Sequence, residues 1–356
     1  MKVLLTGGTG FLGKKVLSQL LLLPQVTRVV VVTRTLKSHP SPRVHLLNLD
    51  LSHPSAMNSL PTDIDCVVHL AGLYDFEADF TKNYIQNVVP TLNLLDKMRE
   101  LNTAKRVPLL FASTYAVGFG LKKPLLEEPV TLLPPKSVPY AFSKATAEKA
   151  VTESGIPAQI FRFGILVGEQ ENGAIEKVDG PYTFVRLISK LGSLAASLSR
   201  PRHFKILTST AVTRWGYLPF PGDSEGILPF VPVDVAAKVV TQSVDGLSQW
   251  TGTQEIYGVY NPSSVTVKKF SELLLGEYMP GFKPVFVSSL PAWSLKFQRA
   301  ITQVSGTSFE FALNPLQLSN LNFVERFKDV SIPPFESYAP SFFQGYQDYV
   351  GEGPNA

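Results

Sequence analysis

The sequence contains one cysteine, Cys66, and no pair of histidines at the spacing that metal ligands take on a helix. Disulfide frameworks and thiolate metal sites both need several cysteines, so the sequence excludes both. Lysine and arginine exceed aspartate and glutamate by only 33 to 29, which leaves no dense basic surface for a nucleic acid. We therefore expect a protein without a metal ion, in a reducing, cytoplasmic compartment.

Charged residues and long apolar runs are also scarce. Only 17% of the 356 residues are charged, against about 25% in an average protein, so the chain can bury a large core instead of remaining disordered. The longest uncharged run, residues 107–121, is shorter than the roughly 20 apolar residues of a membrane-spanning helix. The N-terminal MKVLLTGG has the pattern of a strand and lacks a signal-peptide core. The sequence therefore predicts neither a transmembrane segment nor export, and leaves a peripheral membrane contact open.

Short β-branched runs alternate with longer amphipathic stretches through the first half of the chain. This alternation is typical of βαβ units, whose strands form a parallel sheet with helices on both faces. We therefore predict an α/β fold with a doubly wound parallel sheet. The expected strands are residues 2–6, 28–33, 44–48, 66–70, 108–112 and 158–163, and the expected helices are residues 11–23, 81–101 and 140–154.

The alternation weakens after about Gly164, where glycine, proline and aromatic residues become frequent. Residues 230–245 again have the pattern of a strand and a helix, and residues 257–262 that of one late strand. From about residue 265 onward we expect mostly helix and loop. The prediction is therefore two interleaved parts. A sheet domain comprises residues 1–165 and about 228–262, and a smaller C-terminal lobe for the substrate comprises about 166–227 and 263–356.

A glycine-rich loop, TGGTGFLG at residues 6–13, joins the first predicted strand to the first predicted helix. In a dinucleotide-binding loop, one glycine makes the sharp turn, a second lets the backbone approach the pyrophosphate, and a third lets the helix pack on the strand. Gly7, Gly10 and Gly13 have this spacing, and free N–H groups at the helix start attract phosphate. Lys15 stands where a P-loop needs a hydroxyl for magnesium, so we favour a dinucleotide. The other expected cofactor-binding residues of the loop are Thr9, Phe11 and Leu12.

The residues after the second predicted strand indicate which dinucleotide is preferred. An NAD enzyme usually has an acidic residue about 20 positions beyond the loop, where it binds the ribose 2′-hydroxyl. This chain has Val32-Thr33-Arg34-Thr35 at that position, with no Asp or Glu. The Arg34 guanidinium can form charge-assisted hydrogen bonds to a 2′-phosphate. We therefore expect NADP(H) as the preferred cofactor, with NAD(H) as the alternative.

Two further segments carry side chains suited to proton transfer. Tyr140 and Lys144 are four residues apart in a predicted helix, which places the phenol and the ammonium on one face. A neighbouring cation favours the phenolate, so we expect Lys144 to lower the pKa of Tyr140. Ser113 and Thr114 follow a predicted strand at the carboxyl edge of the sheet, where open α/β sheets bind ligands. Either hydroxyl can orient a substrate carbonyl.

Together these motifs resemble the extended short-chain dehydrogenase/reductase superfamily, whose cofactor domain is a Rossmann fold. The resemblance implies that Tyr140 is the general acid and that Lys144 binds the nicotinamide ribose and lowers the tyrosine pKa. It implies that Thr114 orients the carbonyl, with Ser113 as the alternative, and that Asn87 supports the active-site helix or serves as a structural cap. It also implies that Asp50 and Leu51 lie by the adenine, and Leu70, Ala71 and Gly72 along the cofactor. The motifs are TGGTGFLG at 6–13, HLAG at 69–72, NVVPTLNLL at 87–95, ST at 113–114, YAFSK at 140–144 and FVPVDVA at 230–236.

The stretch after the sixth predicted strand indicates a branch of this superfamily. It reads RFGILVG at residues 162–168, with Ile165 where the sugar-nucleotide enzymes have an asparagine that contacts the diphosphate. It is more similar to the reductases of apolar substrates, although Phe163 replaces their usual proline. Residues 172–182 are similar to the next segment of thioester reductases, which are relatives of the fatty acyl-CoA reductases. The resemblance therefore implies an NADPH-dependent reductase of lipid metabolism, acting on the carbonyl or acyl thioester of an apolar small molecule.

Other functions and roles stay open. The chain could be a sugar-nucleotide epimerase or dehydratase with bound NAD, or a non-catalytic protein that senses NADP. The aromatic C-terminal stretch, residues 335–349, could pack on the substrate, form a homodimer contact or touch lipid. Four aromatic residues could line an apolar pocket or belong to the core: Trp215, Tyr217, Phe220 and Phe230. Three basic residues could meet a CoA phosphate, an anionic membrane or only solvent: Arg200, Arg202 and Lys205.

Overall fold

The structure is a computed structural model of the chain and describes residues 1–35, 38–75, 78–197, 216–221, 223–287 and 316–351. The chain divides into two compact units. Unit 1 comprises residues 1–166, 231–260 and 317–332, and unit 2 comprises residues 167–230, 261–316 and 333–356. The sequence had assigned residues 317–332 to the smaller lobe. They cluster with unit 1 because the backbone N–H groups of Asn322 and Phe323 donate to the Glu127 carboxylate there.

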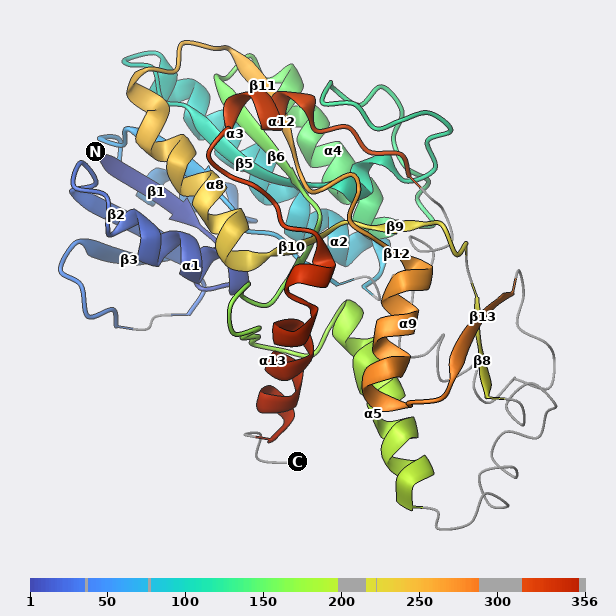
Figure 1. Ribbon diagram of the computed structural model, residues 1–356. Coiled ribbons are helices and arrows are strands. Elements are labelled where there is room, and N and C mark those ends of the chain that lie inside the picture. Colours follow the sequence, from blue (N-terminus) through green and yellow to red (C-terminus); the bar gives the residue numbers. More distant parts are fainter. Residues whose placement is uncertain (36–37, 76–77, 198–215, 222, 288–315, 352–356) are drawn as a thin grey trace. The chain divides into compact units, whose positions relative to one another are not determined.

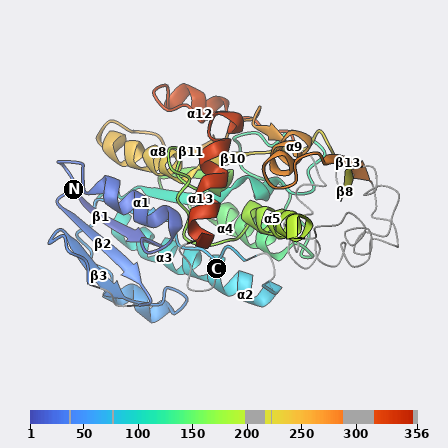
Figure 2. The same ribbon diagram turned by 60° about the horizontal axis from the view of Figure 1, so that its bottom comes forward.

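Unit 1 is built around a seven-stranded parallel sheet, which confirms the predicted fold class. The strand order is β11-β6-β5-β4-β1-β2-β3. From β1 the chain adds β2 and β3 on one side and then β4, β5, β6 and β11 on the other, so the direction in which strands are added reverses at β1. Figures 1 and 2 show β1, β2 and β3 side by side at the edge near the N-terminus. Ligands of such sheets bind at the carboxyl ends of the strands next to this reversal. The strands are β1 (Lys2–Thr6), β2 (Arg28–Thr33), β3 (Val44–Asn48), β4 (Cys66–His69), β5 (Leu109–Thr114), β6 (Ala158–Phe163) and β11 (Gln254–Val259).

Helices cover both faces of this sheet (Figure 1). On one face Leu5 packs in a cluster with Val16 and Val240, and on the other Leu4 packs with Leu94 and Val151. Because successive strand residues are buried on opposite faces, the strands need nearly continuous apolar sequence, which accounts for part of the low charge content. The helices are α1 (Phe11–Leu20), α2 (Phe80–Asn87), α3 (Val89–Asn102), α4 (Pro139–Glu153), α8 (Val233–Asp245) and α12 (Leu321–Arg326), with 3₁₀ helices η1 (Pro54–Ser59), η2 (Tyr115–Gly118) and η3 (Gly246–Ser248).

The long helix expected at residues 81–101 is instead two helices, α2 and α3, which meet at Val88. Pro90 lies in the first turn of α3, where its missing N–H costs no helical hydrogen bond, so a new helix can begin there. The strand expected at 108–112 continues to Thr114, and the late strand lies at 254–259 instead of 257–262. The first of these shifts matters for function, because Ser113 and Thr114 are held inside a strand.

In its described residues, unit 2 has two small strand pairs and three longer helices. β12 pairs antiparallel with β9, and β13 pairs parallel with β8, so the part after residue 265 also contains strands. The chain passes between the units within β7 (Ile165–Val167) and within β10 (Phe230–Pro232). The elements of unit 2 are α5 (Pro181–Ser197), β8 (Tyr217–Pro221), β9 (Ile227–Leu228), β12 (Val265–Thr266), α9 (Val267–Tyr278), β13 (Lys283–Val287), η5 (Phe335–Ser337) and α13 (Ala339–Gly351).

Aromatic rings from distant segments form the core of unit 2. The ring centroid of Phe335 lies 5.0 Å from that of Phe230, 5.7 Å from that of Phe270 and 5.2 Å from that of Phe342. Tyr182 stacks on Phe342 with centroids 4.5 Å apart. The C-terminal aromatic stretch is therefore largely core. Phe220 is buried like Phe230, whereas Tyr217 is 40% exposed, and Arg200, Arg202, Lys205 and Trp215 lie outside the described residues.

Candidate active site

The glycine loop between β1 and α1 leaves no room for larger side chains. Gly7 has a φ of 72°, and a Cβ there would lie 2.6 Å from the backbone nitrogen of Ala71. A Cβ at Gly13 would collide with the carbonyl oxygen of Gly7. No side chain caps α1 at Gly10, so the N–H groups of its first turn, which begins at Phe11, can receive a ligand. This cradle of backbone fits the pyrophosphate of a dinucleotide.

The segment after β4 lies directly beside this loop. β1 and β4 are adjacent, and the Thr6 hydroxyl accepts a hydrogen bond from the Ala71 N–H at 3.2 Å. The same hydroxyl is 2.6 Å from Nδ1 of His69, whose Nε2 lies 3.2 Å from the Thr91 hydroxyl. Burial lowers the pKa of His69 to about 3, so the ring is neutral. Two buried threonines thus hold a neutral histidine beneath the loop that leads to Gly72.

Gly72 lies between two of the expected site residues. A Cβ there would lie 3.2 Å from Oδ1 of Asn87 and 3.7 Å from Nζ of Lys144. The Asn87 amide accepts from the Leu73 N–H at 2.6 Å and donates to the Ser143 hydroxyl of α4 at 3.0 Å. Asn87 therefore ties the loop after β4 to α4, the helix that carries Tyr140 and Lys144.

Lys144 is buried beneath the carboxyl edge of the sheet. Its Nζ donates to the carbonyl oxygen of Ala112 at 2.7 Å and lies 5.1 Å from the ring centroid of Phe111. Burial lowers the pKa of Lys144 to about 8, and the negative charge of Glu148 opposes this shift. The Lys144 side chain can therefore gain or lose a proton at slightly alkaline pH.

Tyr140 lies one helical turn before Lys144, and the Thr114 hydroxyl hydrogen-bonds to its phenol. The Tyr140 ring also makes an edge contact with Tyr74, with centroids 5.6 Å apart. The pKa of Tyr140 is raised to about 12 because burial outweighs the lowering by Thr114. The expectation that Lys144 lowers this pKa is wrong for this structure, in which desolvation of the phenol dominates. The phenol is consequently protonated at neutral pH.

Ser113 has a different partner from Thr114. Its hydroxyl donates to the Glu148 carboxylate, which is also paired with Arg162, the residue opposite Ser113 in the β5–β6 register. Arg162 further donates to the carbonyl oxygens of Leu126 and Glu128, both at 2.6 Å. Neither Glu148 nor Arg162 is exposed, so their charges are satisfied entirely within the protein. This arrangement leaves Thr114 as the hydroxyl beside Tyr140.

The expected adenine-side residues lie at the ends of β2 and β3, which are adjacent strands. Nη1 of Arg34 donates to Oε1 of Gln86 in α2 at 2.8 Å. Asp50 accepts from the backbone and hydroxyl of Ser52, which lowers the pKa of its carboxyl. Leu51 is buried, and its carbonyl oxygen accepts from Asn93. Arg34 and Asp50 thus lie together near one edge of the sheet, whereas Thr114 ends β5 on the other side of β1 in the strand order.

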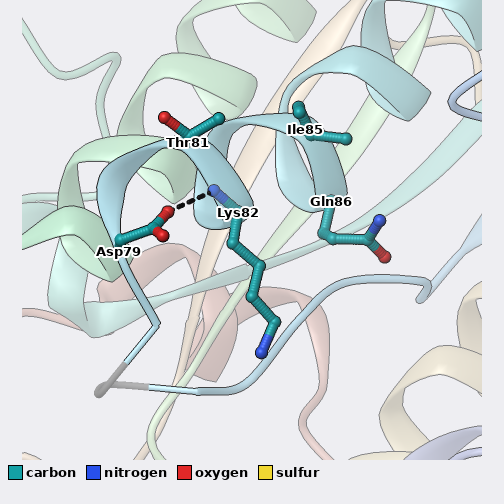
Figure 3. A pocket seen from close by; sticks show the side chains of 5 residues that line it. All are labelled: Asp79, Thr81, Lys82, Ile85 and Gln86. Atoms are coloured by element: carbon teal, nitrogen blue, oxygen red, sulfur yellow. Dashed lines mark hydrogen bonds between the residues drawn. The ribbon is translucent and has the colours of Figure 1, made fainter.

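A shallow groove runs along α2 (Figure 3). Lys82 and Gln86 extend from one side of the helix, and Thr81 and Ile85 from the other. Asp79 caps the helix through the Lys82 N–H at 2.7 Å. None of the expected catalytic residues lines this groove. Within the described residues no cluster of His, Cys, Asp and Glu could hold a metal ion, and no helix is long and apolar enough to cross a membrane.

Sequence reasoning did not single out His69, Gln86 or Glu148. His69 belongs to the HLAG motif and Arg162 to the stretch RFGILVG, both of which are recognisable in the sequence. A polar residue in a buried strand needs a buried partner, so a partner for each could have been expected. Glu148 follows Lys144 by four residues, a spacing that places it on the same helix face as Tyr140 and Lys144. Gln86 carried no signal, because its contact with Arg34 joins residues 52 positions apart.

Comparison with known proteins agrees with these features. The family described as "NAD dependent epimerase/dehydratase family" matches residues 3–183, about half of the chain. D-erythronate dehydrogenase of Haemophilus influenzae is 30% identical over 161 residues, which are 43% of this chain and 50% of that protein. Adenylate-forming reductase Nps11 of Serpula lacrymans is 27% identical over 224 residues, which are 54% of this chain and 20% of that protein. The chain thus spans half or less of the length of these relatives.

Among solved structures, the terminal R domain from the myxalamid PKS-NRPS biosynthetic pathway has a TM-score of 0.70 at 22% identity. The match covers 99% of this chain and 92% of that domain. At this identity the likeness shows the fold alone. Together with the family match, it confirms the resemblance on which the sequence interpretation rested.

Proposed function

Because the chain belongs to the NAD dependent epimerase/dehydratase family, we propose that it is an NADPH-dependent reductase of carbonyl or acyl-thioester compounds with an apolar chain. The observation that carries the proposal is the hydrogen bond between the Thr114 hydroxyl and the Tyr140 phenol at the carboxyl edge of the sheet. Lys144 follows one helical turn later, beside Gly72 and close to the backbone cradle that fits a dinucleotide.

Each residue of this cluster has a chemical task in the proposed reaction. NADPH, when bound, supplies the hydride that reduces the carbonyl carbon. The carbonyl oxygen then gains negative charge, which the hydroxyls of Thr114 and Tyr140 stabilise by donating hydrogen bonds. Tyr140 transfers its proton to this oxygen, because its raised pKa keeps it in the acid form at neutral pH. Lys144, with a pKa of about 8, can return a proton to the tyrosinate.

The two substrate classes lead to different products. Reduction of an aldehyde or ketone yields an alcohol. Reduction of a thioester first yields a hemithioacetal, whose carbon–sulfur bond breaks to release an aldehyde and a thiol as the hydroxyl proton leaves and the sulfur is protonated. Ile165 after β6, where the sugar-nucleotide enzymes have an asparagine, and the similarity to an adenylate-forming reductase support a reductase over a sugar-nucleotide enzyme. Arg34, at the position where NAD enzymes carry an acid, supports NADPH.

The test is NADPH oxidation by the full chain with acyl-CoA thioesters and aldehydes of increasing chain length. We expect turnover that increases with chain length and that Tyr140→Phe reduces by about 10² to 10⁴-fold, the usual contribution of a general acid. Tyr84→Phe is the matched control, because Tyr84 stacks on Phe80 in α2 and also loses only a phenol hydroxyl. Turnover that survives in Tyr140→Phe would overturn the mechanism. Cofactor binding without turnover on any of these compounds would favour a sensing role.

A second candidate is an oxidoreductase or epimerase that retains NAD. The family description and the relative D-erythronate dehydrogenase both favour it. NAD, when bound, would then take the hydride from an alcohol that the hydroxyls of Thr114 and Tyr140 hold. The two candidates differ in the cofactor that the protein holds. Denaturation of the purified protein should release no stoichiometric NAD if the NADPH-dependent reductase is correct, and one equivalent of NAD if this second candidate is correct.

A further inference from the structure

The hydrogen bond between Arg34 and Gln86 joins two elements at the edge where the cofactor ribose is expected. Arg34 follows the last residue of β2, and Gln86 lies one position before the end of α2. Nη1 of Arg34 lies 2.8 Å from Oε1 of Gln86, a normal distance for this bond. A long arginine side chain at a strand end has many rotamers, and this contact selects one of them.

We propose that Gln86 is a positioning residue that holds the Arg34 guanidinium for the 2′-phosphate of NADPH and so contributes to the cofactor preference. The inference rests on the NADPH preference in the proposed function and adds a residue from another element to it. The bond to Gln86 uses Nη1 of Arg34, so Nε and Nη2 can still form the paired hydrogen bonds that a guanidinium makes with a phosphate.

The neutrality of the glutamine amide is central to this role. A carboxylate at position 86 would bind the guanidinium more strongly, but it would also cancel the positive charge that attracts the phosphate. The nearby acid, Asp50, is held by hydrogen bonds of 2.9 Å and 2.8 Å from Ser52. The charge of Arg34 contributes to the lowered pKa of the Asp50 carboxyl, but the hydrogen bonds of this carboxyl go to Ser52. Arg34 is thus fixed in place while its charge stays available.

The surroundings of Gln86 provide a matched control. Figure 3 shows that Gln86 and Thr81 extend from opposite sides of α2. Both side chains are polar and line the same shallow groove, but of the two it is Gln86 that hydrogen-bonds to Arg34. Lys82, which extends on the same side as Gln86, is paired with Asp75 at 3.1 Å.

The experiment measures the Kd of the full chain for NADPH and for NADH, by quenching of protein fluorescence, in a double-mutant cycle. Gln86→Ala should weaken NADPH binding about 3-fold, within the range of one hydrogen bond, and Gln86→Glu about 10-fold or more through loss of net charge. The Kd for NADH should change in neither variant. In an Arg34→Ala background, both substitutions at position 86 should have no further effect on NADPH. Thr81→Ala should bind both cofactors like the wild type.

Three results would overturn the inference, and they differ in what else they overturn. If Arg34→Ala weakens NADPH binding but both Gln86 variants bind like Thr81→Ala, Gln86 has no positioning role and the proposed cofactor preference stands. If Arg34→Ala leaves NADPH binding unchanged, the preference itself is wrong and the role of Gln86 falls with it. Equal weakening of NADPH and NADH by Gln86→Ala would show general damage to α2, which also contradicts the inference.

Discussion

Unit 1 and unit 2 differ in what they bury. Among the described residues, every buried lysine, arginine and glutamate lies in unit 1, and the interior of unit 2 is filled by aromatic rings. Burying a charge costs free energy unless partners replace the lost water. Glu148 has Arg162 and Ser113 as partners, and Lys144 has the Ala112 carbonyl. Unit 1 thus carries this cost at the carboxyl edge of its sheet, beside the residues proposed to transfer protons. The aromatic core of unit 2 carries no such cost.

The largest expected effect is on the buried ion pair of unit 1. Glu148→Ala leaves the Arg162 charge buried without its partner and should lower the free energy of unfolding by about 3–5 kcal/mol. Glu153→Ala is the control on the same helix, because it breaks the exposed pair with Lys149 and should cost at most about 1 kcal/mol. Urea denaturation of both variants checks this. Similar losses would show that burial does not govern the strength of these pairs.

The two hydroxyls at the end of β5 should differ in their effect on activity. Thr114→Ala removes a hydrogen-bond donor beside Tyr140 and should lower kcat/KM by about 10² to 10³-fold. It should also cost about 0.5–2 kcal/mol of stability, because the Thr114 hydroxyl caps η2 by accepting from the Ala116 N–H. Ser113→Ala should cost about 1–3 kcal/mol of stability, because Glu148 loses a buried donor, with a much smaller loss of turnover. NADPH-dependent turnover and urea denaturation of both variants test the assignment. A larger loss of turnover in Ser113→Ala would reverse the two roles.

A glycine contact should disturb unit 2 without affecting cofactor binding. A Cβ at Gly345 of α13 would collide with the carbonyl oxygen of Gly173, so Gly345→Ala should lower stability by about 1–3 kcal/mol. Gly276 of α9 has nothing within 4 Å of the corresponding position, so Gly276→Ala should raise stability by about 0.5–1 kcal/mol. Both variants should keep the wild-type Kd for NADPH. Loss of NADPH binding in Gly345→Ala, but not in Gly276→Ala, would show that the packing of unit 2 does affect cofactor binding.

The smallest expected effect is the dependence of stability on pH through His69. The pKa of His69 is about 3 in the folded protein and 6.5 ordinarily. Between these values the unfolded chain binds a proton that the folded chain does not, so stability falls as the pH decreases, by at most about 1.4 kcal/mol per pH unit. His69→Asn removes this contribution. Unfolding free energies at about pH 7 and pH 5 should therefore differ more in the wild type than in this variant. Equal differences would show that His69 is protonated in the folded state.

Much of unit 1 follows from local sequence. The strands at residues 2–6 and 28–33 have the bounds that their apolar runs predict, because a strand buried on both faces must be nearly apolar throughout. The strands at residues 44–48 and 158–163 also have the predicted bounds. The glycine loop was recognisable for a similar reason, since a positive φ at Gly7 and the close approach at Gly13 tolerate no side chain. In both cases the physical requirement falls on consecutive residues.

The core of unit 2 and the division of roles in the site could not be obtained in this way. Phe230, Phe270, Phe335 and Phe342 meet although they are far apart in the chain. The sequence alone left Phe230 as either pocket or core, and it left the stretch 335–349 as a contact with substrate, a second copy or lipid. The raised pKa of Tyr140 has the same origin, because the degree of burial of a phenol depends on residues from several elements.

The amino-acid order alone establishes that this chain forms a doubly wound sheet with a dinucleotide loop and a Tyr140–Lys144 pair on one helix. The folded chain assigns partners: Thr114 to Tyr140, Ser113 to Glu148 and Gln86 to Arg34. The reason is that backbone requirements act between neighbouring residues, whereas hydrogen bonds and desolvation depend on which distant side chains share the same interior.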